Sequence, residues 1–99
     1  MEIKKTQAGG TDVLALIGRL DTTTAPKLQK LLMKVISEAA AVELDFAEVD
    51  YVSSAGLRVL LIGQKSAQSS GKTMSLKHVS SDVMEVFDMT GFTALFHFE

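Results

Sequence analysis

Two adjacent serines stand where the stretch YVSSAGLRVLL, residues 51–61, changes from a strand-like pattern to a strongly apolar helical one. A hydroxyl at the start of a helix lies beside free backbone N–H groups and the positive end of the helix dipole, which favour an attached phosphate. The small side chains of Ala55 and Gly56 keep such a hydroxyl approachable by another protein's active site. These residue types suit phosphorylation at Ser54 or Ser53 as one interpretation, and an added charge of about −1.5 to −2 there should leave the fold intact.

Two other roles remain open for the same serines. Either hydroxyl could cap the helix by accepting a hydrogen bond from an N–H group of its first turn. The strand, turn, serine and helix also match half of the nucleophile elbow G-x-S-x-G, with Val52 in place of the first glycine. A serine nucleophile would need a histidine base, for which His78 and His97 are the candidates.

Three charged residues border the predicted junctions between strands and helices. Asp21 precedes a threonine-rich helix start, where it either caps a turn or lies near the serines and shapes how a kinase or phosphatase recognises them. Asp50 comes shortly before the serines, and Arg58 follows them in the first turn of the helix. Arg58 is either a solvated surface arginine or a contact for a partner.

The composition excludes several classes of chemistry. The 99 residues include no cysteine, which rules out disulfides, thiolate metal sites and thiol nucleophiles. No glycine-rich phosphate-binding motif is present and the histidines lack metal-ligand spacing, so we expect neither a cofactor nor a metal ion. With 10 basic and 12 acidic side chains, the net charge of −2 lacks the basic excess of a nucleic-acid-binding protein. We expect a soluble cytoplasmic protein, because no apolar run could serve as a signal core or membrane span.

Hydrophobic periodicity predicts the elements that position these residues. The predicted strands cover residues 1–6, 12–20, 41–46, 72–79 and 94–98, and the predicted helices cover residues 22–40, 54–70 and 80–89. Threonines offer an N-cap for the first helix, and Pro26 falls in its first turn, where proline is tolerated. Residues 47–54 are predicted to be a connection between a short strand and the second helix.

This order of elements predicts a single α/β domain over residues 1–99. We expect a mixed sheet of four to five strands, with a parallel core, an antiparallel edge strand and three to four flanking helices. The loops that follow parallel strands emerge at the same end of the sheet. Loops 18–24, 47–54 and 79–82 should therefore lie together, and with them the polar side chains of the first two loops.

Three segments carry a resemblance to a known family. GRLDTTTAPKL, LDFAEVDYVSSAGLRVLL and VFDMTGF resemble, in order and spacing, the STAS domains of bacterial anti-sigma factor antagonists, over nearly the whole chain. The resemblance implies a small α/β fold whose mixed sheet is flanked by helices. It also implies a serine that an ATP-dependent anti-sigma factor kinase phosphorylates and a PP2C-type phosphatase dephosphorylates. The unmodified protein would bind the kinase and thereby release a sigma factor.

The usual local pattern of that family is Asp-Ser-Ser/Thr-Gly-Leu. Aligned on Gly56-Leu57, the acceptor is Ser54 and the aspartate position holds Ser53, which is the alternative acceptor. Asp21 matches the aspartate of the family's G-x-L-D segment. The implied partner-binding surface comprises Asp21, Thr22, Thr23, Ser53, Ser54, Ala55, Gly56 and Arg58.

The resemblance leaves one alternative function. STAS domains also serve as scaffold subunits of lipid-transport or stress-sensing complexes that need no kinase cycle. Under either function we expect a protein-binding module rather than an enzyme, with no direct contact to nucleic acid or membrane.

Overall fold

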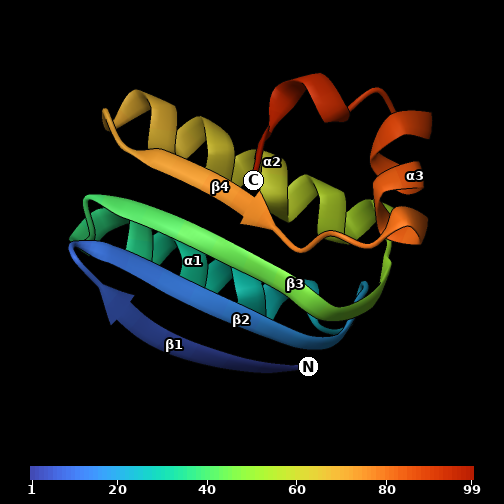
Figure 1. The fold of residues 1–99 in the computed structure, drawn as a ribbon, viewed down its shortest axis with the longest axis horizontal. Coiled ribbons are helices and arrows are strands. Elements are labelled where there is room, and N and C mark those ends of the chain that lie inside the picture. Colours follow the sequence, from blue (N-terminus) through green and yellow to red (C-terminus); the bar gives the residue numbers. More distant parts are fainter.

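Five strands form one sheet in the order β1-β2-β3-β4-β5 (Figure 1). The computed structural model describes residues 1–99. The strands are β1 (Glu2–Ala8), β2 (Thr11–Leu20), β3 (Ala41–Val52), β4 (Thr73–Lys77) and β5 (His97–Phe98), and the helices are α1 (Ala25–Glu38), α2 (Ser54–Ser69), α3 (Ser81–Met89) and the 3-10 turn η1 (Thr93–Leu95). β1 pairs with β2 antiparallel, and all other neighbours are parallel. The predicted parallel core with an antiparallel edge strand is therefore confirmed.

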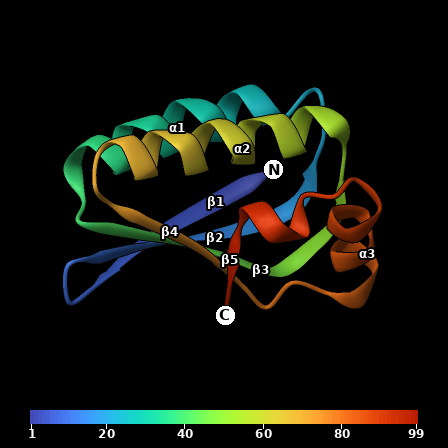
Figure 2. The same cartoon turned by 90° about the horizontal axis from the view of Figure 1, so that it is seen from above.

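Helices α1 and α2 lie side by side on one face of the sheet, and no helix covers the opposite face (Figure 2). The chain advances one strand at a time from β2 to β4, and right-handed crossovers in a constant direction place their helices on the same face. Leu14, Leu44 and Leu76 lie under the helices and are completely buried. We call the opposite side the bare face.

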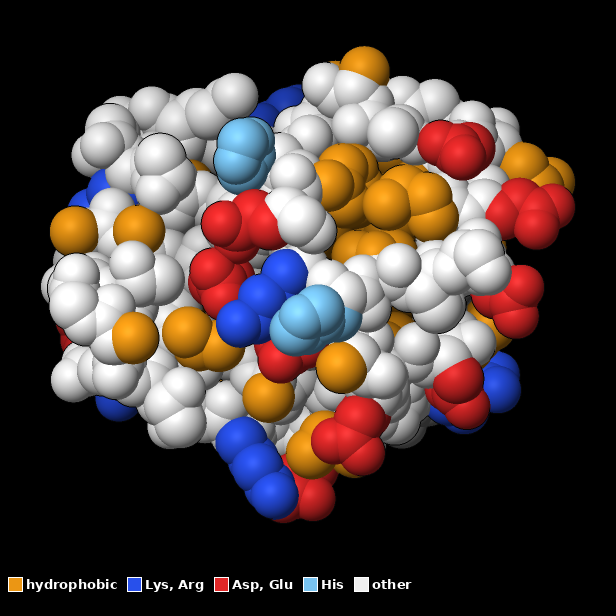
Figure 3. Space-filling model, in the orientation of Figure 1, with side chains coloured by type: hydrophobic (Ala, Val, Ile, Leu, Met, Phe, Trp, Pro, Cys, Tyr) orange, Lys and Arg blue, Asp and Glu red, His pale blue; other side chains and the backbone are white.

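The bare face is polar along β3 and β4, since alternate residues of a strand point to opposite faces. Lys77 Nζ lies 2.6 Å from Glu43 Oε1, and His78 Nδ1 lies 3.0 Å from Asp45 Oδ1. The Lys77 ammonium lowers the pKa of Glu43, and the Glu43 carboxylate raises the pKa of Lys77. Figure 3 views the molecule with the strands in front and shows acidic, basic and histidine side chains together at the centre of this face.

Strand β3 is longer than the sequence indicates. Residues 47–52, predicted to be part of a connection, continue the strand as far as Val52. The prediction was wrong because β3 contains two register irregularities against β2, which break the two-residue alternation. Its buried residues in this half are Phe46, Val49 and Val52, three positions apart rather than two.

Beyond Asp45, β3 has no strand on its outer side, because β4 ends at the partner of Asp45, Lys77. Helix α3 packs against β3 there, with the ring of Phe87 6.5 Å from that of Phe46. Phe96 and Phe98 lie 5.5 and 5.4 Å from Phe87. This aromatic cluster joins α3 and the C-terminal residues to the main core.

Charge is segregated between the layers. Helices α1 and α2 expose Lys27, Lys30, Lys34, Arg58 and Lys65, and their one acidic residue is Glu38. Helix α3 carries only acidic charges, at Asp82, Glu85 and Asp88, all exposed. The small net charge of the chain therefore conceals a basic helical layer.

Candidate functional site

The two serines occupy different positions at the start of α2. Ser53 is the N-cap, with φ −89° and ψ 173°, and its Oγ accepts a hydrogen bond of 3.2 Å from the N–H of Gly56. Ser54 is the first helical residue; it is exposed, and its hydroxyl makes no hydrogen bond within the protein. The predicted capping role thus belongs to Ser53, and the free hydroxyl belongs to Ser54.

Asp21 organises the loop between β2 and α1. Its Oδ1 accepts hydrogen bonds from the N–H groups of Thr23 (3.0 Å) and Thr24 (3.1 Å). The backbone bond from Thr24 is the main cause that holds the pKa of Asp21 below its ordinary value of 3.8, and Arg19 adds a smaller effect. The predicted turn-capping role of Asp21 is confirmed.

The threonine caps of α1 differ from the prediction. Thr24 is the N-cap residue, yet its side chain caps no helical N–H group. Its Oγ1 instead donates to the carbonyl of Arg19 (2.7 Å) and accepts from the N–H of Asp21 (2.8 Å). The hydroxyl groups of Thr22 and Thr23 make no hydrogen bonds within the protein, and both residues are exposed. Their side chains are therefore accessible.

The loops of Asp21 and of the serines are joined directly. The N–H of Ser53 donates to the carbonyl of Leu20 at 2.8 Å, and Leu20 pairs with Val52 across the strands. Gly56 allows this closeness, since a Cβ there would lie 2.6 Å from Leu20 Cγ and 3.0 Å from its carbonyl oxygen. All the predicted partner-binding residues therefore belong to two connected loops and the first five residues of α2.

The third predicted loop does not join the other two through any hydrogen bond. It leaves β4 at Lys77, beside Asp45 in the middle of β3, because β4 is much shorter than β3. Asp50 is exposed near the end of β3 and makes no side-chain hydrogen bond.

An Arg–Tyr pair that the sequence did not reveal borders these loops. The guanidinium carbon of Arg19 lies 4.2 Å from the centre of the Tyr51 ring, and Arg19 Nε lies 3.8 Å from Asp21 Oδ2. The only signal in the sequence is that each residue lies within two positions of a site residue, in GRLD and in DYVSS. Arg58 is exposed on α2 and makes no ion pair.

Neither serine makes a hydrogen bond with a histidine. His78 Nδ1 contacts Asp45 Oδ1 instead, at 3.0 Å. The serine beside His97 is a different one, Ser75, which is its register partner across β4 and β5. The hydroxyl of Ser75 donates its hydrogen bond to Glu99 Oε2, at 2.9 Å, rather than to His97. The nucleophile–base contact that a serine hydrolase requires is therefore absent from the structure.

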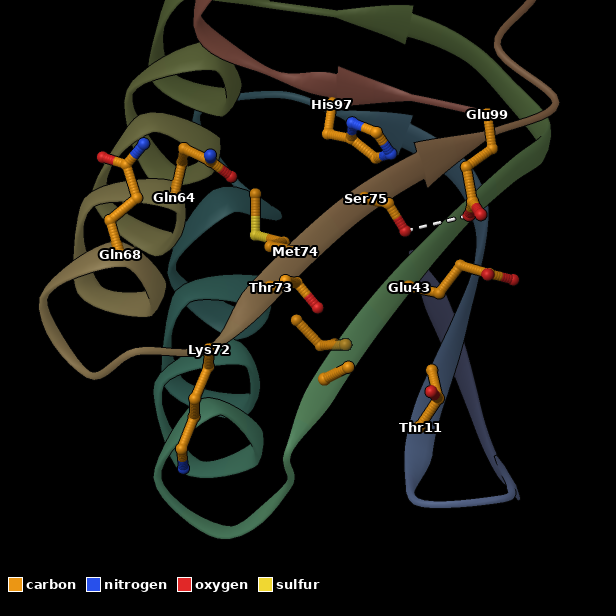
Figure 4. Close-up of a pocket in the computed structure, with 12 residues that line it drawn as sticks. Thr11, Glu43, Gln64, Gln68, Lys72, Thr73, Met74, Ser75, His97 and Glu99 are labelled. Atoms are coloured by element: carbon orange, nitrogen blue, oxygen red, sulfur yellow. Dashed lines mark hydrogen bonds between the residues drawn. The ribbon is translucent and has the colours of Figure 1, made fainter.

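One hollow lies at the opposite end of the sheet from the serines. It has a volume of about 460 Å³ and borders the first residues of β2, β3 and β4. Gln64 and Gln68 of α2 line one side of β4, and Ser75 and Glu99 lie on the other (Figure 4). This polar, shallow hollow contains none of the predicted partner-binding residues, and of the two candidate histidine bases only His97 lines it.

None of the helices of the protein combines the length and the apolar character that crossing a bilayer requires. No three His, Cys, Asp or Glu side chains are grouped so that they could hold a metal ion.

Comparisons with known proteins agree on one family. The family model described as "Mlab, STAS domain" matches residues 3–97. BtrV of Bordetella bronchiseptica, provisionally named as an anti-sigma factor antagonist, is 31% identical over 97 residues, covering 97% of this chain and 84% of BtrV. The anti-sigma-B factor antagonist of Bacillus subtilis is 28% identical over 76 residues, covering 77% of this chain and 70% of the relative.

The fold is also that of a solved antagonist. The unphosphorylated form of the anti-sigma factor antagonist SpoIIAA superposes with a TM-score of 0.82 at 17% identity, covering 99% of this chain and 88% of SpoIIAA. The phosphorylated form of this Bacillus protein superposes with a TM-score of 0.76 at 16% identity, covering 99% and 91%.

Proposed function

The chain belongs to the STAS domain family, and from this premise we propose that it is an anti-sigma factor antagonist switched by phosphorylation of Ser54. In the unmodified state it binds an anti-sigma factor that is itself a serine kinase, and this binding frees a sigma factor. The kinase then transfers the γ-phosphoryl group of ATP to Ser54 Oγ, which ends the complex. A PP2C-type phosphatase removes the phosphate and restores binding.

The observation that carries this proposal is the difference between the two serine hydroxyls. Ser53 Oγ is engaged by the N–H of Gly56 in a half-buried position, whereas Ser54 Oγ is exposed and free. A kinase can approach the second hydroxyl without breaking a cap. The family's local pattern, aligned on Gly56-Leu57, and the geometry of the two hydroxyls therefore support the same acceptor, Ser54.

A phosphate on Ser54 is compatible with the fold and incompatible with an unchanged interface. Its charge of about −1.5 to −2 would lie at the N-terminus of α2, where the helix dipole favours anions. In a protein interface, an unpaired buried charge costs roughly 2 to 5 kcal/mol. Since about 1.4 kcal/mol corresponds to a tenfold change in affinity, this cost is large enough to switch binding.

The relatives support the same mechanism by analogy. B. subtilis and Listeria proteins similar to this chain are named anti-sigma-B factor antagonists. SpoIIAA, with which this chain shares its fold, has been solved both with and without phosphorylation.

The first test is phosphoryl transfer measured by intact mass. We would incubate the protein with ATP and each purified anti-sigma factor kinase of the source genome, alongside Ser54→Ala and Ser53→Ala. We expect one phosphoryl increment in the wild-type protein and in Ser53→Ala, and none in Ser54→Ala. An increment lost only in Ser53→Ala would move the acceptor by one residue, and no increment in any folded protein would contradict the switch.

The second test measures binding to the same kinase without ATP. Ser54→Ala should bind as the wild-type protein does, because the proposed contact needs no phosphate. Ser54→Asp should bind at least tenfold more weakly, because it adds a negative charge to the interface. Equal binding by both variants would contradict the proposed mechanism.

One observation favours a second candidate function. Ser53 occupies the position at which the usual pattern of the family, Asp-Ser-Ser/Thr-Gly-Leu, has aspartate. No carboxylate therefore directly precedes the acceptor. A kinase-independent STAS scaffold subunit of a lipid-transport or stress-sensing complex does not need that carboxylate. Normal folding without phosphorylation by any kinase would favour the scaffold function.

A further inference from the structure

Arg19 and Tyr51 form an exposed pair directly beside the loops of the proposed partner surface. They are register partners on β2 and β3, and the Arg19 guanidinium stacks over the Tyr51 ring. Tyr51 is 41% exposed and the Arg19 side chain is 60% exposed. Exposed large apolar side chains are few on this protein, the others being Met89 and Leu95.

A β-bulge brings the two side chains to the same face. The register advances from Gly18–Val49 to Arg19–Tyr51, which makes Asp50 an extra residue on β3. Because side chains alternate along a strand, Leu20 and Val52 are then both buried under the helices, and Arg19 and Tyr51 both point to the bare face. Bulges commonly re-aim side chains next to functional sites.

The pair is continuous with the serine loop. Arg19 and Tyr51 directly precede Leu20 and Val52, and the Leu20 carbonyl accepts the hydrogen bond from the N–H of Ser53. A protein that covers Ser54 and the Asp21 loop would therefore reach the pair without crossing another element. The edge of the bare face and the start of α2 form one contiguous surface.

We propose that the Arg19–Tyr51 pair is a second anchor for the anti-sigma factor that binds the surface around Ser54. This inference rests on the proposed function. Tyrosine and arginine are the residue types that most often dominate interface energies. The guanidinium already contacts the Tyr51 ring and the Asp21 carboxylate, and such contacts reduce the side-chain entropy that is lost when a partner binds. Since Arg19 Nε faces Asp21, the remaining N–H groups suit a partner that presents a carboxylate beside an apolar side chain.

The test is the affinity of pair variants for the kinase that phosphorylates the wild-type protein, measured without nucleotide by calorimetry. Tyr51→Ala and Arg19→Ala should each weaken binding by about thirtyfold, the size typical of an interface hot spot. Tyr51→Phe keeps the ring, so its affinity should stay within about threefold of that of the wild-type protein. Arg19→Lys keeps the charge but loses the planar guanidinium, so it should bind more weakly than the wild-type protein. Lys30→Ala, exposed on α1, is the matched control and should bind normally. Thermal unfolding of every variant ensures that only folded proteins are compared.

The outcomes separate the two proposals. If the wild-type protein binds and both alanine variants bind within about threefold of it, the anchor is wrong and the proposed function stands. If the wild-type protein binds none of the kinases, the proposed function and the anchor are both overturned. Weak binding by the alanine variants together with normal binding by Lys30→Ala would support the anchor.

Discussion

At the scale of single residues, the main finding is a division of labour between two adjacent hydroxyls. Ser53 has an extended backbone and caps α2, whereas Ser54 is the first helical residue and is free. The sequence predicts a capping serine but not which one, because the identity of the N-cap depends on one backbone torsion angle. Helix boundaries are uncertain by a residue or two when only the sequence is known.

The cap can be tested by its contribution to stability. Ser53→Ala should lower the free energy of unfolding by about 1 kcal/mol, because the N–H of Gly56 loses its acceptor. Ser53→Asp should keep most of the stability, since aspartate caps as well as serine does. Urea denaturation followed by circular dichroism measures both changes. Ser54→Ala is the control, and a loss there equal to that of Ser53→Ala would contradict the assignment.

Asp21 should make stability depend on pH. Its pKa in the folded protein lies below the ordinary value of 3.8, so the carboxylate stabilises the fold above that value. The contribution disappears as the pH falls through the lowered pKa. Asp21→Asn keeps an acceptor oxygen but cannot titrate, so between about pH 6 and about pH 3 it should lose less stability than the wild-type protein. Identical pH profiles in urea denaturation would rule this role out.

At the scale of elements, β3 decides the geometry of the site. Its two extra residues relative to β2 produce buried positions three apart, which breaks the two-residue alternation by which a strand is recognised. A single sequence therefore indicates a loop where the strand continues. The turn and cap residues around Asp21 could be predicted, because their hydrogen bonds are local, whereas the Arg19–Tyr51 contact depends on the register of two distant strands.

Two glycines of α2 should respond differently to alanine. At Gly56 an added Cβ would lie 2.6 Å from Leu20 Cγ and 3.0 Å from the Leu20 carbonyl oxygen, which cannot move without shifting the end of β2. At Gly63 the nearest atom is Leu32 Cδ2, at 2.5 Å, the tip of a flexible side chain. Alanine gains up to about 1 kcal/mol in helix propensity at either site.

We therefore expect Gly56→Ala to destabilise the protein by about 1–3 kcal/mol, as overpacked sites do, and Gly63→Ala to be nearly neutral. Chemical denaturation compares the two variants. Gly56→Ala should also weaken kinase binding, because it separates the serine loop from the Asp21 loop. A larger loss of stability at Gly63 would contradict the distinction between backbone and side-chain neighbours.

At the scale of the whole molecule, one core holds the sheet, the helices and the C-terminal residues together. Fold class and element order were predictable, because they depend on hydrophobic patterns summed over many residues. The packing of α3 beside β3 was not, because it follows from β4 ending early at Lys77.

Phe87 tests whether α3 belongs to this core. It is completely buried and contacts the rings of Phe46, Phe96 and Phe98. Phe87→Ala should lower the free energy of unfolding by about 3–5 kcal/mol. Phe92, half-buried at the edge of the cluster, is the matched control and should cost less as alanine. Circular dichroism and the fluorescence of the single tyrosine, Tyr51, should report one coincident urea transition, and separate transitions would show that α3 unfolds independently.

The segregation of charge between the layers makes the surface charge of the molecule differ from one side to the other. The outer side of α1 and α2 is basic, although the chain has a net charge of −2 and a pI near 5.6. A charged chromatography resin contacts one side of a protein at a time and so responds to local rather than total charge. At neutral pH and low salt, the protein should therefore be retained by cation-exchange as well as by anion-exchange columns, and it should adsorb through opposite sides on the two resins.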